Sequence, residues 1–528
     1  MHETELLILG LCVAIPTFSV IARLLGIPYP IVLVLGALPL GYLPGVPHVE
    51  LEPDLVLVIF LPPLLYVAAF FADLRALRAD ARGISLTSIG LVLVTTCAVA
   101  VVGHELIGLP WAVAFALGAI VSPTDPVAAT AIARELGAPR RLVTMIEGES
   151  LVNDSSALIA YRVAVAAALG GSFSLFDASV DFVVAVLGGI AVGLAVGAVI
   201  AEIRRRLDDI PVEITISIFS GFAAYLPAEQ LGVSGVLAAV TTGLYLGWLA
   251  PQISTAQMRI QGFAVWELIV FVLNAILFVL IGLQLPNILD EVSGTEAGTL
   301  AGYALAIIGV VVGARFLWLF TTPYLIRAFD RRPSQVERRV GAAPRVVVGW
   351  AGMRGAVSLA AALALPLETH AGAPIPDRDL VIFLAYCVVL FTVVVQGLTL
   401  PTLIRRLGVV DDGTEEEAEE HAARIAAAEA ALEALDGLAE EEWTREDSVG
   451  RLRALYVFRR RRFATLRGDL EDQDGIVDRS LAYQRLMHEV IEAQRAAIVR
   501  MRNEGLISAE VMRRVESDLD LEESRLEI

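Results

Sequence analysis

The stretch SPTDPVAATAI, residues 122–132, places a charged side chain and two helix-breaking residues inside a long apolar segment. Asp125 is flanked by Pro123 and Pro126, and a proline has no backbone N–H to donate within a helix. The residue before each proline is also pushed toward extended backbone. A helix that crosses this segment is therefore expected to be interrupted, which leaves carbonyl groups near Thr124 and Asp125 without helical partners.

The composition is that of a membrane protein with a soluble tail. The chain has 528 residues, is 56% hydrophobic and 19% charged, and has a mean hydropathy of +0.69, whereas an ordinary soluble domain is about a quarter charged. Up to residue 407 the chain is a series of apolar runs, each long enough to cross a bilayer. We expect an all-α, polytopic transmembrane domain over 1–407 and an acidic helical tail over 408–528 that is regulatory or dimer-stabilising.

Breaks at proline, glycine and charged clusters divide the membrane part into thirteen candidate spans. The spans are 5–23, 28–44, 54–72, 84–106, 110–133, 142–169, 176–202, 210–227, 231–250, 262–285, 297–326, 343–366 and 378–404.

The arginines give these spans a direction. Nineteen arginines lie in alternate connections, and Arg378 is the one arginine in the opposite loops. Basic loops stay in the cytoplasm, so the N-terminus is expected outside and the tail inside the cell (cytoplasmic) membrane, with the spans in contact with lipid. From residue 411 onward the tail has 30 acidic residues and 17 arginines, a balance that argues against nucleic acid as a partner.

Two of the spans are interrupted in corresponding positions. The fifth contains SPTDPVA, and the twelfth contains GWAGMRGAVSLA, residues 349–360, where glycines recur every third residue around Arg354. Spans seven apart cross the membrane in opposite directions, and paired interruptions of this kind mark an inverted-repeat transporter. We therefore predict about thirteen transmembrane helices in inverted repeats, with two broken helices that cross.

The sixth span carries the densest polar segment of the membrane part, EGESLVNDSSALIAYR, residues 147–162. Helical geometry places Ser150 and Asp154 on one stripe and Glu149 and Asn153 on a second stripe, about 100° away. Ionisable residues inside a membrane mark function by default, usually an ion path.

The two stripes suggest two different jobs. We predict that Asp154, with Ser150, faces the interruption at Thr124–Asp125 and binds a cation, while Glu149 pairs with Arg354 as a structural ion pair. The spans offer two further basic residues as partners of Asp154, Arg162 and Arg315.

A buried carboxylate next to a broken helix can hold a proton or a metal ion in turn. Burial disfavours the charged carboxylate, whereas a bound cation favours it, so the two ligands compete and can be exchanged across the membrane. No cofactor is needed, and no GxxxxGK[ST] phosphate loop is present. An enzyme is not expected, because GESLV has Val152 where a nucleophile elbow requires glycine.

At these residues the sequence resembles the monovalent cation:proton antiporters of the CPA1 family, the sodium/proton exchangers that include the bacterial NhaP-type proteins. Six motifs in order carry the resemblance over residues 1–407. They are FLPPLLYVAAFFADLRALR, SPTDPVA, GESLVNDSSAL, LGVSGVLAAVTTGLYLG, VFVLNAILFVLIGLQLP and GMRGAVSLAAALALP. The resemblance implies a thirteen-helix homodimer in which a mobile core with two broken helices slides against a dimerisation domain.

Positions matched to the family's motifs imply roles for individual residues. Asp154 would bind the cation and the proton, and Asn153 would complete the Asn-Asp pair of electroneutral members. Ser150, Thr124 and Asp125 would be further ligands. Glu149 and Arg354 would form the ion pair of the core.

One departure bears on selectivity. Many relatives carry a glutamate after PPLLF that joins the ion site, whereas this chain has Val67 and Ala68. Electroneutral exchange of Na+ (or Li+) for H+ is the leading hypothesis, and K+/H+ exchange by the same machine is the alternative. A cation channel or a membrane sensor acting through the tail is a more distant one, since a channel needs a continuous pore and a sensor does not need paired breaks.

Overall fold

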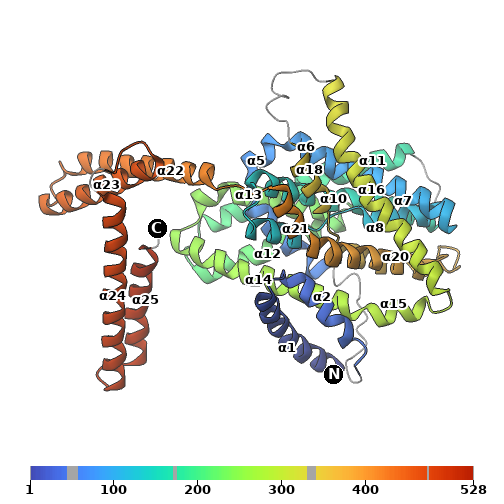
Figure 1. Ribbon diagram of the computed structural model, residues 1–528, viewed down its shortest axis with the longest axis horizontal. Coiled ribbons are helices and arrows are strands. Elements are labelled where there is room, and N and C mark those ends of the chain that lie inside the picture. The colour runs from blue at the N-terminus through green and yellow to red at the C-terminus, as the bar shows by residue number, and fades with distance from the viewer. Residues whose placement is uncertain (1, 44–56, 171–174, 330–340, 473–474, 527–528) are drawn as a thin grey trace. The chain divides into compact units, whose positions relative to one another are not determined.

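The computed structural model describes residues 2–43, 57–170, 175–329, 341–472 and 475–526, and it is built of α-helices (Figure 1). Among these residues the pairing of extended backbone is limited to an isolated bridge between Glu368 and Pro374. The all-α prediction is therefore confirmed. The chain divides into two compact units, Met1–Val410 and Asp411–Ile528.

The first unit contains long helices interleaved with short ones. In chain order its elements are α1 (His2–Leu25), α2 (Tyr29–Leu40), α4 (Leu61–Phe70), α5 (Leu74–Ala79), α6 (Ala81–Ser85), η1 (Leu86–Leu91), α7 (Val92–Val102), η2 (Gly103–Ile107), α8 (Trp111–Val121), α9 (Val127–Glu135), α10 (Arg140–Ala168), α11 (Leu175–Arg204), α12 (Ile210–Gln230), α13 (Gly235–Ile253), α14 (Ala256–Leu283), α15 (Leu285–Glu291), α16 (Ala297–Phe329), α18 (Ala342–Trp350), α19 (Ala356–Leu363), α20 (Arg378–Phe391), η3 (Thr392–Gln396) and α21 (Gly397–Leu407).

Eight helical segments of this unit are long and apolar enough to cross a membrane. They are Ile8–Leu25, Ala81–Ile107, Ser179–Arg204, Ile210–Gln230, Gly235–Ile253, Ala256–Glu291, Ala297–Ile326 and Arg378–Leu407. Three shorter apolar helices, among them α2 and α8, accompany them, and the polar α10 is a further long helix. The count of thirteen crossings stays a prediction, and residues 44–56 and 330–340 lie outside the described residues.

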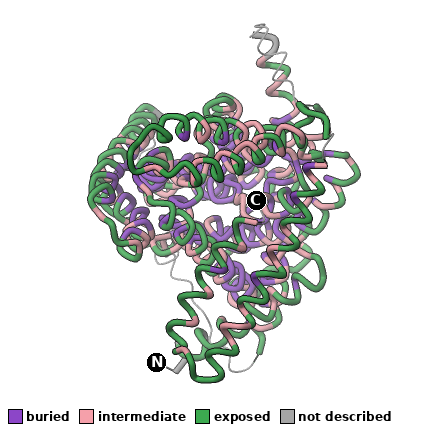
Figure 2. The backbone as a smooth tube through the Cα atoms, turned by 90° about the vertical axis from the view of Figure 1, so that its left-hand side faces the viewer, coloured by how far each residue is buried: buried purple, intermediate pink, exposed green. Residues whose placement is uncertain are grey.

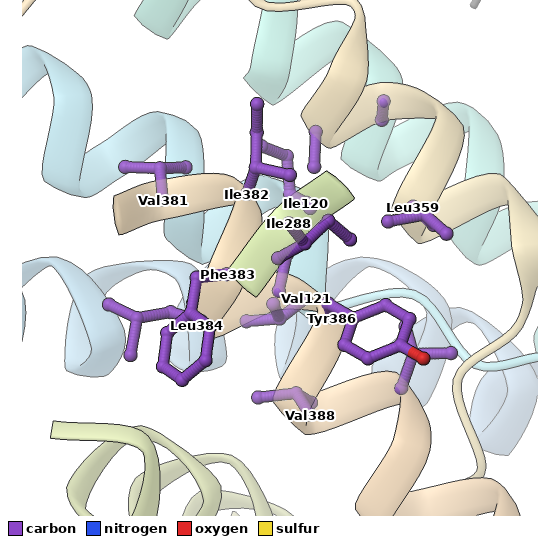
Figure 3. Packing of buried hydrophobic residues seen from close by; sticks show 14 of the residues in the cluster. Ile120, Val121, Ile288, Leu359, Val381, Ile382, Phe383, Leu384, Tyr386 and Val388 are labelled. Atoms are coloured by element: carbon purple, nitrogen blue, oxygen red, sulfur yellow. The ribbon is translucent and has the colours of Figure 1, made fainter. Parts of the chain in front are cut away.

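The interior of this unit is apolar, and the broken spans run through it. Ile120 and Val121 at the end of α8, Leu359 of α19 and Tyr386 of α20 belong to one buried cluster (Figure 3). Buried residues lie inside the bundle and the more exposed helices surround them (Figure 2). The polar residues of the broken spans are thus held in a low-dielectric interior, where an unpaired polar group is costly.

Two of the long spans contain π-helical turns near the broken segments. The span Ala81–Ile107 contains η1 and η2, and the span Arg378–Leu407 contains η3. A π-turn inserts an extra residue into a helix and changes which side chains face a neighbour, and such turns are frequent at functional sites.

The second unit consists of two helical hairpins. The first pairs α22 (Thr414–Leu438) with α23 (Glu446–Arg467), and the second pairs α24 (Ile476–Asn503) with α25 (Ala509–Ser524). Phe463 of α23 is buried, and the guanidinium of Arg424 lies 5.2 Å from its ring centroid. Ile476 and Ile491 of α24 and Leu519 of α25 are buried apolar residues of the second hairpin.

Arg495 of α24 ties the second hairpin together. Its guanidinium donates to Glu492, Asp520 and Glu523 over 2.6, 2.7 and 2.8 Å. The hydrogen bond from Arg495 lowers the pKa of the Glu523 carboxyl. Because the folded pKa lies below the unfolded value of about 4.3, the ionised carboxylate stabilises the hairpin above that value, and the contribution is lost as the pH falls through the folded pKa.

We therefore expect α25 to lose protection against hydrogen exchange at acidic pH, and Glu523→Gln to flatten this dependence. The measurement is hydrogen–deuterium exchange of the full-length protein, corrected for intrinsic rates. Glu510→Gln is the matched control, because Glu510 makes only an exposed pair with Arg514 on its own helix. The same pH dependence in Glu523→Gln as in the unmodified protein would contradict the assignment.

Candidate functional site

The first interruption lies where the sequence predicts it. Helix α8 ends at Val121 and α9 begins at Val127, so residues 122–126 connect two half-helices. The backbone N–H of Asp125 in this connection donates to the carbonyl of Met353 over 2.8 Å. The first broken span is thereby bonded directly to the second.

The second interruption separates α18 from α19 over residues 351–355. Two of its glycines are required by close approach. A Cβ atom on Gly355 would lie 1.8 Å from Oδ2 of Asp125, and one on Gly352 would lie 2.4 Å from Nε of Arg315. The two broken spans and α16 therefore meet at a point where side chains larger than hydrogen do not fit.

At the crossing, where residues 122–126 meet residues 351–355, charged side chains bond to the ends of the half-helices. Asp125 Oδ1 accepts the N–H of Val127 over 2.9 Å at the start of α9. Arg354 does the opposite, since its Nε donates to the carbonyl of Val121 over 3.0 Å and its Nη1 donates to that of Gly352. Helix N-termini favour negative charge and C-termini positive charge, so these two residues neutralise the interrupted ends.

Helix α10 brings its polar stripe to the first interruption. Asn153 Nδ2 donates to Thr124 Oγ1 over 2.8 Å, and Thr124 Oγ1 in turn donates to Glu149 Oε1 over 3.1 Å. The amide oxygen of Asn153 is buried and has no hydrogen-bond partner among the described residues. The structure thus joins Thr124, Asn153 and Glu149 in one chain of hydrogen bonds that crosses from the broken span to α10.

The partner of Glu149 differs from the one expected from the sequence. Arg315 of α16, and not Arg354, donates to both carboxylate oxygens, over 2.5 and 3.1 Å. Arg315 also donates to the carbonyl of Val348. The physical reason is that the guanidinium of Arg354 donates to the carbonyls of Val121 and Gly352. Arg315 stands out in the sequence as an arginine inside the apolar run 297–326. From the sequence it was considered only as a partner of Asp154.

Asp154 lies one turn along α10 from Ser150, and both are buried, with Asp154 8% exposed. Within the described ranges the Asp154 carboxylate makes no hydrogen bond or ion pair. The two arginines that competed for it in the sequence are engaged elsewhere, Arg162 with Glu229 over 2.5 Å and Arg315 with Glu149.

Asp154 also lies close enough to Asp125 for their charges to interact. A buried carboxylate that faces another carboxylate and lacks a cationic partner is strongly disfavoured unless a proton or a cation neutralises it. The arrangement can therefore hold either one at this position.

The position at which many relatives carry a glutamate supplies no oxygen here. Val67 of α4 is buried in an apolar cluster with Leu246 and Trp266. The neighbouring Tyr66 hydroxyl lies 3.4 Å from Ser217 Oγ. Val67 therefore adds no side-chain oxygen to the ion site.

Comparisons with known proteins identify the family of the chain. A family model described as "Sodium/hydrogen exchanger, transmembrane" matches residues 8–406. The chain belongs to the sodium/hydrogen exchanger family. The resemblance noted in the sequence is confirmed, and the chain is a multi-pass membrane antiporter.

Relatives of this exchanger cover most of its length. It is 38% identical over 529 residues to an uncharacterised Na+/H+ exchanger of Mycobacterium tuberculosis, with 98% of this chain and 97% of the relative covered. It is 34% identical over 414 residues to the sodium, potassium, lithium and rubidium/H+ antiporter of Bacillus subtilis, covering 75% and 61% of the two chains.

A solved structure shares the fold of this exchanger. The sodium proton antiporter MjNhaP1 from Methanocaldococcus jannaschii aligns with a TM-score of 0.57 at 19% identity, covering 77% of this chain and 99% of that one. At that identity the likeness shows the fold alone.

Proposed function

We propose that this exchanger moves Na+ (or Li+) against H+ across the cytoplasmic membrane, one for one, with the two ions competing for Asp154. The observation that carries the proposal is the Asp154 carboxylate itself, buried on α10 beside the first interruption and without a cationic partner among the described residues. A cation bound there displaces the proton, and a proton bound there displaces the cation. Alternating access of the loaded site to the two faces of the membrane then exchanges the ions.

Oxygen ligands for the cation are available around Asp154. Hard cations prefer oxygen, and the neighbouring polar groups are the Ser150 hydroxyl, the Thr124 hydroxyl and carbonyl, the Asn153 amide oxygen and the Asp125 carboxylate. Asp125 already bonds to a helix end, because its Oδ1 accepts the N–H of Val127 at the start of α9. We assign it mainly to the helix ends and assign the other three to the ion.

K+/H+ exchange is the second candidate, and one observation favours it. Val67 and Ala68 stand where the family resemblance implies a glutamate, and the surroundings of Val67 are apolar. A site with one carboxylate fewer binds a small, strongly hydrated cation less selectively. The Bacillus subtilis relative is named for sodium, potassium, lithium and rubidium, which is the breadth expected of such a site.

The proposal extends to the orientation of the protein in the membrane and to its oligomeric state. The arginine distribution supports an N-terminus outside and a cytoplasmic tail. We propose a homodimer in a lipid membrane, with the unit Asp411–Ile528 as a regulatory or dimer-stabilising tail. Exposed apolar side chains on α24, including Leu486 and Val490, support a partner for this unit.

Reconstitution into liposomes tests the function. We expect purified protein, given a pH gradient, to move protons when Na+, Li+ or K+ is added, and to do so without generating a membrane potential. Raising the pH should lower the cation concentration that gives half the maximal rate, because fewer protons compete for the carboxylate. Proton movement that needs no added cation would contradict antiport, and a potential that follows the cation would contradict one-for-one exchange.

A further inference from the structure

Thr392 is a fully buried residue at the first position of η3, with none of its surface exposed. Its hydroxyl donates to the carbonyl of Val389 over 3.1 Å. A hydroxyl has one proton to give, so its remaining lone pairs can only accept. They accept the backbone N–H of Arg354 over 3.0 Å.

Arg354 needs this acceptor because it lies in the second interruption. An unbroken helix would pair its N–H with a carbonyl four residues earlier, but α18 ends at Trp350. A buried N–H without a partner is rare in folded proteins. Thr392 satisfies it, and the span Arg378–Leu407 thereby holds the backbone of Arg354 while the carbonyls of Val121 and Gly352 hold its guanidinium.

The π-turn η3 lies beside the second interruption, residues 351–355. The N–H of Arg354 donates to Thr392 in this turn, and a Cβ atom on Gly397, which follows it, would be in van der Waals contact with the end of the Met353 side chain. A comparable arrangement occurs at η1. There Ser88, also without exposed surface, donates to the backbone carbonyl of Glu149 over 2.9 Å. Both π-turns thus place a buried hydroxyl on the backbone of a residue at the crossing.

The position of Arg354 matters for Thr124 because of Glu149. Arg354 lies near the Glu149–Arg315 pair, because it donates to the carbonyl of Gly352, and a Cβ atom on Gly352 would lie 2.4 Å from Nε of Arg315. Oε1 of Glu149 already accepts from Arg315 and from Thr124. An Arg354 side chain released from its carbonyls would be drawn to the same carboxylate and would compete with Thr124 for it.

We propose that Thr392 is a positioning residue for the exchange reaction. By accepting the N–H of Arg354 it keeps this arginine on the helix-end carbonyls and away from Glu149, which preserves the orientation in which Thr124 presents its oxygens to the cation. The inference rests on the proposed function, because it assigns Thr124 to the ion.

The test compares Thr392→Val, which keeps the shape and removes the hydroxyl, with Thr392→Ser, which keeps the hydroxyl. We expect Thr392→Val to raise the cation concentration at half-maximal exchange about tenfold, the ratio typical of one lost buried hydrogen bond. Thr392→Ser should stay near the unmodified value. Thr17→Val is the matched control, because the Thr17 hydroxyl bonds only to Val13 of its own exposed helix.

Each outcome decides the matter. The inference is overturned if Thr392→Val leaves the cation concentration at half-maximal exchange unchanged, or if Thr392→Ser raises it equally. In either case the proposed function stands, as long as the unmodified protein exchanges the ions. Failure of the unmodified protein to exchange would overturn both. If Thr392→Val does not fold, as judged by its thermal melting, Thr392→Ala is measured in its place and must show the same rise.

Discussion

Asp154→Asn is expected to abolish cation-dependent proton movement in liposomes. The substitution keeps the size of the side chain but removes the negative charge and the proton that it binds at α10. Breaking a buried charge pair costs about 3–5 kcal/mol, and a cation at this site would lose its charge partner in the same way. The exchange rate should therefore fall more than about a hundredfold, since each 1.4 kcal/mol is a factor of ten.

The control for this variant is Asp290→Asn, which removes a charge from an exposed residue of α15 in the same unit. It should exchange like the unmodified protein. Thermal melting should show that Asp154→Asn is still folded, and added cation should no longer raise its melting temperature, because a ligand that binds only the folded state stabilises it. Full exchange by Asp154→Asn would end the assignment of the ion to this carboxylate.

Glu149→Gln is expected to destabilise the protein strongly. It leaves Arg315 buried with a charge that no longer has its carboxylate, and both side chains of this pair are only 3% exposed. Removing one partner of a buried ion pair costs about 3–5 kcal/mol in the free energy of unfolding. We expect a large fall in the melting temperature of the detergent-solubilised protein.

The double variant Glu149→Gln/Arg315→Met identifies the partner. It removes both charges at once and should recover much of the lost stability, whereas Glu149→Gln/Arg354→Met should not. Glu202→Gln is the comparison for an exposed pair, because Glu202 bonds to Arg206 on the surface of α11, where such pairs contribute about 0–1 kcal/mol. Recovery with the Arg354 substitution in place of the Arg315 one would contradict the ion pair seen in the structure.

Local signals in the sequence were enough for the interruptions and the polar helix. Pro123 and Pro126 act on their own backbone, so the break between α8 and α9 needed no tertiary information. The stripe that holds Ser150 and Asp154 follows from helical geometry alone. The glycines at 352 and 355 are visible in the sequence as a three-residue repeat, and the structure shows which side chains approach them.

The partners of these residues could not be predicted in the same way. Arg315 and Glu149 are 166 residues apart, and nothing in the sequence shows which arginine of the apolar runs pairs with Glu149. The guanidinium of Arg354 donates to backbone carbonyls, and carbonyls occur at every residue, so they leave no pattern in the sequence. Thr392 and Ser88 are single hydroxyls inside apolar spans, and the π-turns that orient them have no periodic signature.

The order of residues by itself determined that the chain is helical and membrane-embedded, that two spans are interrupted, and that acidic groups lie in the apolar region. Each of these follows from backbone chemistry or from spacing along one helix. Only the tertiary structure decided which charges meet, because contacts between distant spans depend on how helices pack around the glycines of the crossing. That packing pairs Arg315 with Glu149, takes Arg354 to the carbonyls of Val121 and Gly352, and leaves Asp154 without a basic partner among the described residues.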